Sequence, residues 1–248
     1  MNFRYSVFEK VLRYIFRKIF PVPKSPWTAG AVDNICAIHL VPPEKLILFF
    51  AETLKRLSRL KGDAIGDYLE FGVFNGNSIG SMFLALKSFR TNNVRLFGFD
   101  SFSGLPPGAE CEDDGVWKQG FYACSFEQMQ MCLRERGIDP TQFTWIPGWY
   151  EQSLTAGCLR ELSIKHLGIV FVDCDTYSSS KKVLEFIEPL ATEPFIICLD
   201  DWKLNDLDLK GMGEYAAFNE FVERNPQLTF EEITSYNRKS KSFIVIPK

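Results

Sequence analysis

The sequence predicts an α/β fold in which a mostly parallel sheet is covered by helices on both faces. Five short and largely apolar runs alternate with segments of helical spacing, at residues 65–71, 94–99, 143–146, 167–172 and 195–199. Strands with so few polar positions are buried on both faces, which is typical of a doubly wound parallel sheet. The chain has 248 residues, 46% of them hydrophobic, which is enough for one large domain.

Helical patterns separate these strands and also precede them. After the last helix, two strand-like runs at 229–233 and 243–246 predict a closing hairpin. We therefore divide the chain into a helical N-terminal extension, residues 1–60, and a main α/β domain, residues 61–248. Helices are expected at residues 3–20, 43–60, 78–90, 125–136, 151–162, 179–190 and 213–224.

The charge balance and the cysteines limit the classes of partner and compartment. A formal net charge of −3 lacks the basic excess typical of nucleic-acid-binding proteins, so no nucleic acid partner is expected. Seven cysteines without a C-x-x-C pair predict reduced, buried thiols in a cytoplasmic protein. No apolar run approaches the roughly 20 residues needed to span a membrane.

The predicted helix over residues 3–20 is strongly basic. It carries five Lys and Arg residues against one acid, Glu9. We expect it to dock on its own domain or on a second subunit of a homo-oligomer. Peripheral contact with an anionic membrane surface is the alternative.

The first polar motif is the sequence YLEFGVFNGNS over residues 68–78, where a strand turns into a helix. Gly72 and Gly76 allow the backbone to approach a ligand, and the helix that begins near Ser78 offers free N–H groups. Glu70 would repel a pyrophosphate, and the G-x-G-x-x-G motif is absent. The motif favours a ligand with an amino group or a sulfonium, with an ordinary strand-to-helix turn as the alternative.

A second acid, Asp100, ends the second predicted strand and is followed by Ser101. In doubly wound folds this position holds ribose hydroxyls. A nucleoside with a cationic substituent would suit both Glu70 and Asp100.

Four further acids follow the fourth and fifth predicted strands directly. Asp173 and Asp175 come after the fourth strand, and Asp200 and Asp201 after the fifth. The carboxyl ends of parallel strands meet at one edge of the sheet, where α/β proteins bind ligands. Clustered oxygen ligands predict Mg²⁺, Ca²⁺ or Mn²⁺ rather than zinc, although a helix-capping role competes for Asp175.

The histidines contribute little to this prediction. The chain has only two, which favours a carboxylate as proton acceptor. His166 precedes the fourth strand and is expected at the opposite edge of the sheet. His39 is expected to be a surface or packing residue.

In order along the chain, these motifs resemble the macrocin O-methyltransferase-like family. That family comprises class I enzymes that depend on S-adenosylmethionine and methylate sugar hydroxyls of macrolide and aminocoumarin antibiotics. The matching pieces span roughly residues 45–248 and are Glu70–Val73 with Gly76 and Ser78, Gly98–Phe102 with Gly104–Pro106, Gly148–Tyr150, Asp173-x-Asp175-x-Tyr177, Asp200–Trp202, and Gly213-Glu214 with Ala217–Phe221.

The resemblance implies a seven-stranded sheet whose last strand is antiparallel. It also implies Mg²⁺ bound by Asp173, Asp200 and Asp201, with Asp175 at a position proposed as general base. The residues implied to contact S-adenosylmethionine are Glu70, Gly72, Ser78, Asp100 and Ser101, beside Gly76 of the same loop. A histidine that some relatives are suggested to use in catalysis has no clear counterpart here.

The expected function is therefore transfer of a methyl group from S-adenosylmethionine to a hydroxyl of a sugar or related small molecule, assisted by Mg²⁺. Two alternatives stay open: a metal-dependent glycosyltransferase that uses the pattern Asp173-Cys174-Asp175, and a non-catalytic scaffold. The long segment 103–121 is expected to be either a lid over the acceptor or a solvated acidic loop.

Overall fold

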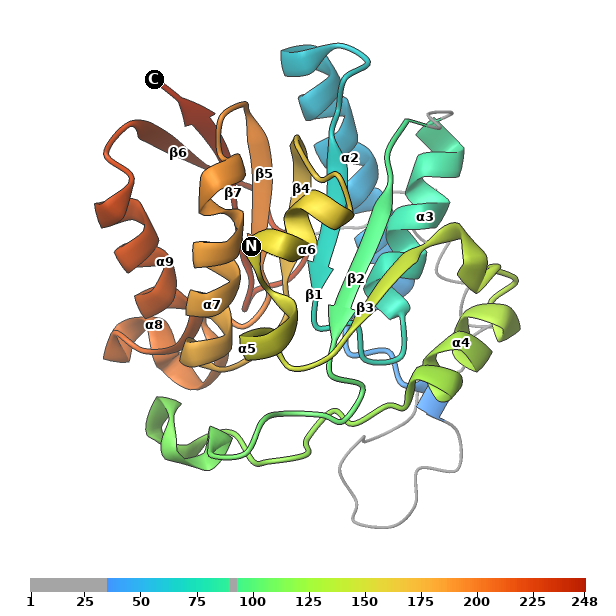
Figure 1. Cartoon of the computed structure of the whole chain (residues 1–248), viewed down its shortest axis with the longest axis vertical. Helices are drawn as coiled ribbons and strands as arrows, with labels where there is room; N and C mark the ends of the chain where they lie inside the picture. The colour runs from blue at the N-terminus through green and yellow to red at the C-terminus, as the bar shows by residue number, and fades with distance from the viewer. Residues whose placement is uncertain (1–34, 90–92) are drawn as a thin grey trace, which may run out of the picture.

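The structure is a computed structural model that describes residues 35–89 and 93–248. The predicted helix at 3–20 lies outside the described residues. A seven-stranded sheet forms the centre of the molecule, in the order β3-β2-β1-β4-β5-β7-β6, and helices lie on both of its faces (Figure 1). The predicted fold class is confirmed.

The five parallel strands match the five predicted runs closely. Their order reverses between β1 and β4, because the chain first adds β2 and β3 on one side of β1 and then β4 and β5 on the other. Such a reversal opens a crevice at the carboxyl ends of the two central strands. The strands are β1 (Asp67–Phe71), β2 (Leu96–Asp100), β3 (Thr144–Pro147), β4 (Leu167–Val172) and β5 (Phe195–Leu199).

The predicted hairpin consists of β6 (Leu228–Ile233) and β7 (Lys241–Pro247). β7 runs antiparallel to both β5 and β6. The antiparallel last strand that the family resemblance implied is therefore present.

One face of the sheet is covered by three helices, α2 (Pro43–Lys61), α3 (Asn77–Phe89) and α4 (Phe126–Glu135). α2 inserts Phe50 and Leu54, both fully buried, into a core that also contains Tyr68 of β1 and Phe171 of β4. The second half of the predicted N-terminal extension is thus docked on the sheet. α4 begins at Ser125 with a capping box.

The other face is covered by α5 (Tyr150–Ser153), α6 (Ala156–Glu161), α7 (Tyr177–Ile187) and α9 (Gly213–Arg224) (Figure 1). One helix was predicted over 151–162, but the structure has two. The break lies at Leu154, after which Thr155 accepts the Cys158 N–H and starts α6. A short helix, α8 (Leu207–Lys210), precedes α9, and single turns of 3₁₀ helix include η1 (Ile35–Ala37), η2 (Ala109–Cys111) and η3 (Asp113–Gly115).

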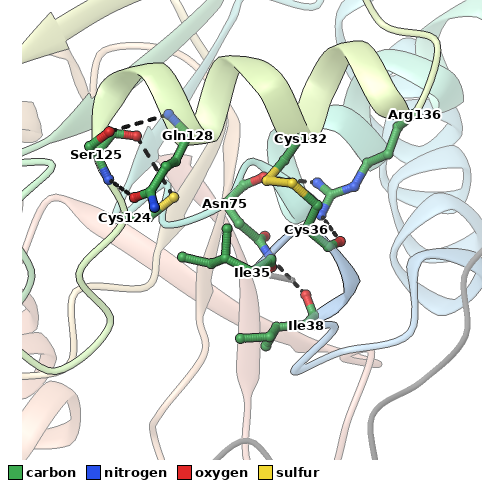
Figure 2. The surroundings of a disulfide bond; sticks show 9 residues. All are labelled: Ile35, Cys36, Ile38, Asn75, Cys124, Ser125, Gln128, Cys132 and Arg136. Carbon is green, nitrogen blue, oxygen red and sulfur yellow. Dashed lines mark hydrogen bonds between the residues drawn. A yellow bond between two sulfur atoms is a disulfide. The ribbon is translucent and has the colours of Figure 1, made fainter. Parts of the chain in front are cut away.

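The prediction that all cysteines are reduced is wrong for one pair. Cys36 of η1 and Cys132 of α4 form a disulfide across 96 residues of sequence (Figure 2). No spacing pattern reveals this pair, because it depends on the packing of η1 against α4. The cytoplasmic prediction, which rested on reduced thiols, loses that support.

Five other cysteines are free: Cys111 is exposed, Cys158 is half-buried, and Cys124, Cys174 and Cys198 are buried. In the part of the chain that the structure describes, no helix is both long and apolar enough to cross a lipid bilayer.

Candidate active site

A deep cleft lies at the carboxyl edge of the sheet, where the strand order reverses. Its empty volume is about 1080 Å³ when the space open to solvent is included. Eight of the ten predicted site residues line it, and Glu70 and Gly76 do not. Those that line it are Gly72, Ser78, Asp100, Ser101, Asp173, Asp175, Asp200 and Asp201.

The loop after β1 is shaped by close packing as well as by its ligand-facing position. Gly72 has φ +91°, and a Cβ atom there would lie 1.6 Å from the backbone oxygen of Asp173. A Cβ on Gly76 would instead approach the side chain of Leu133 on α4 at 3.0 Å. Both glycines therefore let the loop fit between β4 and α4.

Glu70 lies beneath this loop and has no exposed surface. Its carboxylate accepts hydrogen bonds from the Tyr68 hydroxyl and, at 2.7 Å, from Ser78 Oγ. Burial raises the pKa of Glu70 to about 8, although these hydrogen bonds oppose the shift. Glu70 thus holds the first turn of α3 in place through Ser78. It does not line the cleft, so the predicted direct contact between Glu70 and a ligand is not supported.

Asp100 lines the cleft, and its carboxylate also accepts hydrogen bonds from backbone N–H groups. Its carboxylate accepts N–H groups from Val73 at 2.7 Å, Phe74 at 3.0 Å and Phe102 at 2.7 Å. Burial raises its pKa in spite of these bonds. Asp100 therefore holds the β1 loop and the β2 loop together while it lines the cleft.

A wall of the cleft comes from residues 35–41, which the sequence did not link to the site. Ile38, Leu40 and Val41 line the cleft. Asn75 donates to the carbonyls of Ile35 at 2.9 Å and Ile38 at 2.7 Å. The signal for this contact was present in the sequence, as an asparagine inside the glycine loop, but its partner could not be identified.

Further contacts tie the same wall to the loop and to α4. Asn77 donates to the Val41 carbonyl at 2.8 Å. Arg136, just after α4, donates to the carbonyls of Asn75 and Cys36, and the disulfide lies beside it (Figure 2). The loop after β1, the wall and α4 therefore form one connected unit.

The two histidines lie outside the cleft lining, as expected. His39 is buried and contacts Asn77 Oδ1 through Nδ1 at 2.9 Å. Burial and the positive charge of Arg136 lower its pKa to about 4. His166 lies before β4 and pairs with Glu193 at 3.0 Å, at the edge of the sheet away from the cleft.

The three residues that the family resemblance implied as metal ligands converge in the cleft. One carboxylate oxygen from each of Asp173, Asp200 and Asp201 lies within 4.8 Å of the others. The pairing of β4 with β5 explains this, because Val172 is the register partner of Leu199 and the acids directly follow both residues. Asp200 Oδ1 accepts direct hydrogen bonds from the Tyr236 hydroxyl and, at 3.3 Å, from Asn237 Nδ2, both far away in sequence.

The electrostatics of this group suit a divalent cation. Burial raises the pKa of all three carboxyls, and neighbouring carboxylates raise those of Asp173 and Asp201 further. At Asp200 the hydrogen bonds from Tyr236 and Asn237 oppose this rise in pKa, and the positive charge of Lys239 opposes it less. Converging carboxylate oxygens are the ligands that Mg²⁺, Ca²⁺ and Mn²⁺ prefer, so the residues present fit such an ion.

Asp175 lies in the same part of the cleft in a backbone conformation that is unusual for its type. It has φ +67° and is buried. Burial raises its pKa to about 7, while a hydrogen bond with Asp201 opposes the shift. The helix-capping alternative is not observed, since Thr176 caps α7.

Aromatic side chains also line the cleft. Tyr122, Trp149 and Tyr150 are among its lining residues. Two aromatic residues that follow the acidic pairs have other partners: Tyr177 donates to Glu220 at 2.6 Å, and Trp202 is buried in the core.

The segment 103–121 is docked on the body of the molecule and does not form a freely solvated acidic loop. It runs along the carboxyl edge of the sheet (Figure 1), and Leu105 and Pro106 line the cleft. Glu112 and Asp113 accept backbone N–H groups from the first turn of α7. Neither contact has a signature in the sequence.

Comparison with known proteins agrees with this geometry. The O-methyltransferase NovP has a TM-score of 0.68 at 17% identity, with 96% of this chain and 98% of that chain covered. The O-methyltransferase TomG from Streptomyces achromogenes, in complex with S-adenosylmethionine, has a TM-score of 0.54 at 15% identity, with 99% and 92% covered. At these identities the likeness establishes the fold.

Two curated relatives are similar in sequence. An 8-demethyl-8-(2,3-dimethoxy-alpha-L-rhamnosyl)-tetracenomycin-C 4'-O-methyltransferase from Streptomyces olivaceus is 26% identical, with 61% of this chain and 62% of the relative covered. A demethyldecarbamoylnovobiocin O-methyltransferase from Streptomyces niveus is 24% identical, with 61% and 58% covered. The chain thus spans about three fifths of the length of these relatives.

The family model for macrocin-O-methyltransferase (TylF) matches residues 52–224, which is more than half of the chain. The match includes every candidate ligand and catalytic residue described above. The resemblance noted from the order of the motifs is confirmed, and the chain belongs to the macrocin O-methyltransferase family.

Proposed function

We propose that this protein transfers the methyl group of S-adenosylmethionine to a hydroxyl of a carbohydrate-bearing small molecule, with the help of a divalent cation. The observation that carries the proposal is a single cleft lined both by the glycine loop after β1 and by the acids that converge after β4 and β5. Family membership and the two O-methyltransferase relatives support the reaction type.

The cofactor would occupy the end of the cleft formed by Gly72, Ser78, Asp100 and Ser101. Glu70 and Gly76 would act indirectly by fixing the loop. Asp100 would offer its remaining lone pairs to ribose hydroxyls, as acids at this position do in related folds.

The acceptor would lie between the cofactor and the acids. Asp173, Asp200 and Asp201 would hold Mg²⁺, which would lower the pKa of the acceptor hydroxyl and fix its position. The bond between sulfur and the methyl carbon breaks as the acceptor oxygen bonds to that carbon, and the sulfonium becomes a neutral thioether. Asp175 would take the hydroxyl proton and release it to solvent.

The rings of Tyr122, Trp149 and Tyr150 would contact the acceptor. One relative is named for a rhamnosyl tetracenomycin, which supports a sugar hydroxyl as the target.

The metal role is tested by replacing Asp200 and Asp201 with Asn. We expect methyl transfer that depends on Mg²⁺ to be lost, while the affinity for S-adenosylhomocysteine measured by calorimetry stays within about threefold. Asp206→Asn is the matched control, because Asp206 is an exposed acid nearby whose φ of +61° Asn tolerates. Full activity of the Asp200→Asn and Asp201→Asn proteins would rule out the metal role.

The same calorimetry separates the glycosyltransferase alternative. The proposed function requires binding of S-adenosylhomocysteine, which the glycosyltransferase alternative does not. Binding of a nucleotide sugar alone would overturn it. The docking of residues 3–20 on the chain's own domain or on a second subunit stays a prediction, with an anionic membrane as the alternative. Deleting residues 1–24 and measuring stability, oligomeric state and binding to anionic vesicles tests it.

A further inference from the structure

Glu214, in the first turn of α9, is a buried acid beside the metal candidates. Only 1% of its surface is exposed. Its Oε2 accepts the backbone N–H of Asp201 at 2.9 Å. Within residues 35–89 and 93–248, its Oε1 has no hydrogen-bond partner.

The Asp201 N–H lies just beyond the end of β5, where the neighbouring strand no longer offers a carbonyl acceptor. β5 ends at Leu199, and the Asp200 N–H still donates to the Val172 carbonyl of β4 at 3.0 Å. The Asp201 N–H points away from that ladder and is satisfied by Glu214 instead. A buried N–H without a partner is costly, so this carboxylate stabilises the turn.

The peptide unit that Glu214 holds is the one joining Asp200 to Asp201. Because a peptide unit is planar, fixing its N–H restricts the directions in which both flanking side chains leave the backbone. Asp200 is also held through its side chain by Tyr236. The geometry at Asp201 depends more directly on Glu214.

Glu214 itself is not one of the converging ligands. The carboxylate oxygens that lie within 4.8 Å of one another belong to Asp173, Asp200 and Asp201. A further buried acid in such a place increases the repulsion that the other acids experience unless a cation is present. The location of Glu214 therefore fits a residue that holds the metal-binding aspartates in place without binding the cation itself.

We propose that Glu214 is a positioning residue for the divalent cation site, and that it acts by holding the Asp200–Asp201 peptide unit through its hydrogen bond to the Asp201 N–H. The proposal rests on the metal role proposed above.

Two substitutions separate this hydrogen bond from the negative charge. Glu214→Gln keeps a side-chain carbonyl that can accept the Asp201 N–H and removes the charge. Glu214→Met keeps similar volume and flexibility and removes both. Glu223→Met is the matched control, because Glu223 lies on the same helix and is exposed.

The readout is the affinity for Mn²⁺, measured by calorimetry or electron paramagnetic resonance with S-adenosylhomocysteine present. We expect Glu214→Gln and Glu223→Met to bind Mn²⁺ within about threefold of the wild type. Glu214→Met should bind it at least about tenfold more weakly, while all variants keep wild-type affinity for S-adenosylhomocysteine. Rescue by Gln distinguishes positioning from a direct ligand role.

Three results would overturn the proposal. Wild-type Mn²⁺ affinity in Glu214→Met would show that the hydrogen bond does not matter to the site. A loss in Glu214→Gln as large as that in Glu214→Met would assign the effect to charge or direct ligation. A wild-type protein that binds no divalent cation would overturn the metal role as well, so the two failures are distinguishable.

Amide hydrogen exchange in the wild type keeps the proposal testable if Glu214→Met does not fold. The Asp201 N–H should exchange as slowly as those of β5, although it lies beyond the strand. Exchange as fast as that of an unbonded loop amide would contradict the proposed contact.

Discussion

His39 provides a pH-dependent contribution that can be measured at a single residue. Its pKa is lowered to about 4 in the folded protein by burial and by Arg136, from an ordinary value near 6.5. Between pH 4 and pH 6.5, His39 therefore binds a proton more readily in the unfolded chain than in the folded protein. The resulting loss of stability begins as the pH falls below about 6.5 and is complete near pH 4.

We expect the wild type to lose about 2 kcal/mol of unfolding free energy at pH 5, relative to pH 7, through His39. His39→Asn should lack this component. Urea denaturation of both proteins at the two pH values measures it as a difference, which removes the contributions of the acids. Parallel pH dependences of the two proteins would contradict the prediction.

Gly72 should be intolerant of any side chain because of the Asp173 carbonyl. A Cβ atom would lie 1.6 Å from that oxygen, at a φ of +91°. We expect Gly72→Ala to lower the free energy of unfolding by roughly 2–4 kcal/mol and to weaken binding of S-adenosylhomocysteine.

Gly62→Ala is the control for this substitution. Gly62 also has positive φ, +64°, but a Cβ atom there meets nothing within 4 Å. Chemical denaturation gives the free energy of unfolding of both variants. Gly62→Ala reports the cost of a side chain at positive φ alone, and Gly72→Ala reports that cost together with the clash. Equal losses of stability would show that the close approach to Asp173 is not responsible.

At the scale of residues, the sequence predicted acids that directly follow strands and missed residues that support them. Asp173 and Asp200 follow two apolar runs, so their convergence needed only the parallel pairing of adjacent strands. Tyr236 reaches Asp200 and Glu214 reaches Asp201 from later elements, and nothing local marks such contacts. Glu70 shows the reverse problem, because its strand-end position could not reveal that Tyr68 and Ser78 occupy its carboxylate.

At the scale of elements, the Cys36–Cys132 disulfide should support both stability and cofactor binding. It joins η1 to α4 (Figure 2), and residues directly after η1 line the cleft. Cross-linking positions so far apart restricts the unfolded chain. We expect Cys36→Ser to lower the free energy of unfolding by roughly 2–4 kcal/mol and to weaken binding of S-adenosylhomocysteine severalfold.

Cys111→Ser is the control, because Cys111 is a free and exposed thiol. Dithiothreitol should bring the wild type to the level of Cys36→Ser and leave that variant unchanged in thermal melts and calorimetry. If dithiothreitol changes neither the melting temperature nor the S-adenosylhomocysteine affinity of the wild type, the disulfide does not contribute to stability or to cofactor binding.

Helices and strands could be predicted where a continuous apolar pattern defines them. They could not be predicted where their position depends on packing against distant segments. The bounds of β4, β5 and α9 agree with the predicted segments, because apolar runs or a single amphipathic stripe define them. The break between α5 and α6 was missed, because the apolar spacing continues across Leu154. The place of η1 depends on contacts with α4 and the glycine loop, which are far away in sequence.

At the scale of the whole molecule, the order of the motifs predicted the fold, since alternating strands and helices have few arrangements that keep crossovers right-handed. The path of residues 103–121 was not predictable in the same way. It depends on one acid, Asp113, that links three separate segments. Its carboxylate accepts from Trp117 Nε1 at 3.0 Å, from the Tyr177 N–H at 2.9 Å and from the Gly213 N–H at 2.8 Å.

Asp113→Ala should therefore release this segment from the first turns of α7 and α9. Three buried or partly buried N–H groups would lose their acceptor, which we expect to lower the free energy of unfolding by roughly 2–4 kcal/mol. Limited proteolysis should cut within 103–121 faster than in the wild type, and the KM for the acceptor should rise because Leu105 and Pro106 line the cleft. Asp114→Ala is the neighbouring control, since its exposed ion pair with Lys210 should contribute little. Equal protease resistance of the two variants would mean that the apolar contacts of Trp117 and Leu105 with Leu207 hold the segment without the Asp113 carboxylate.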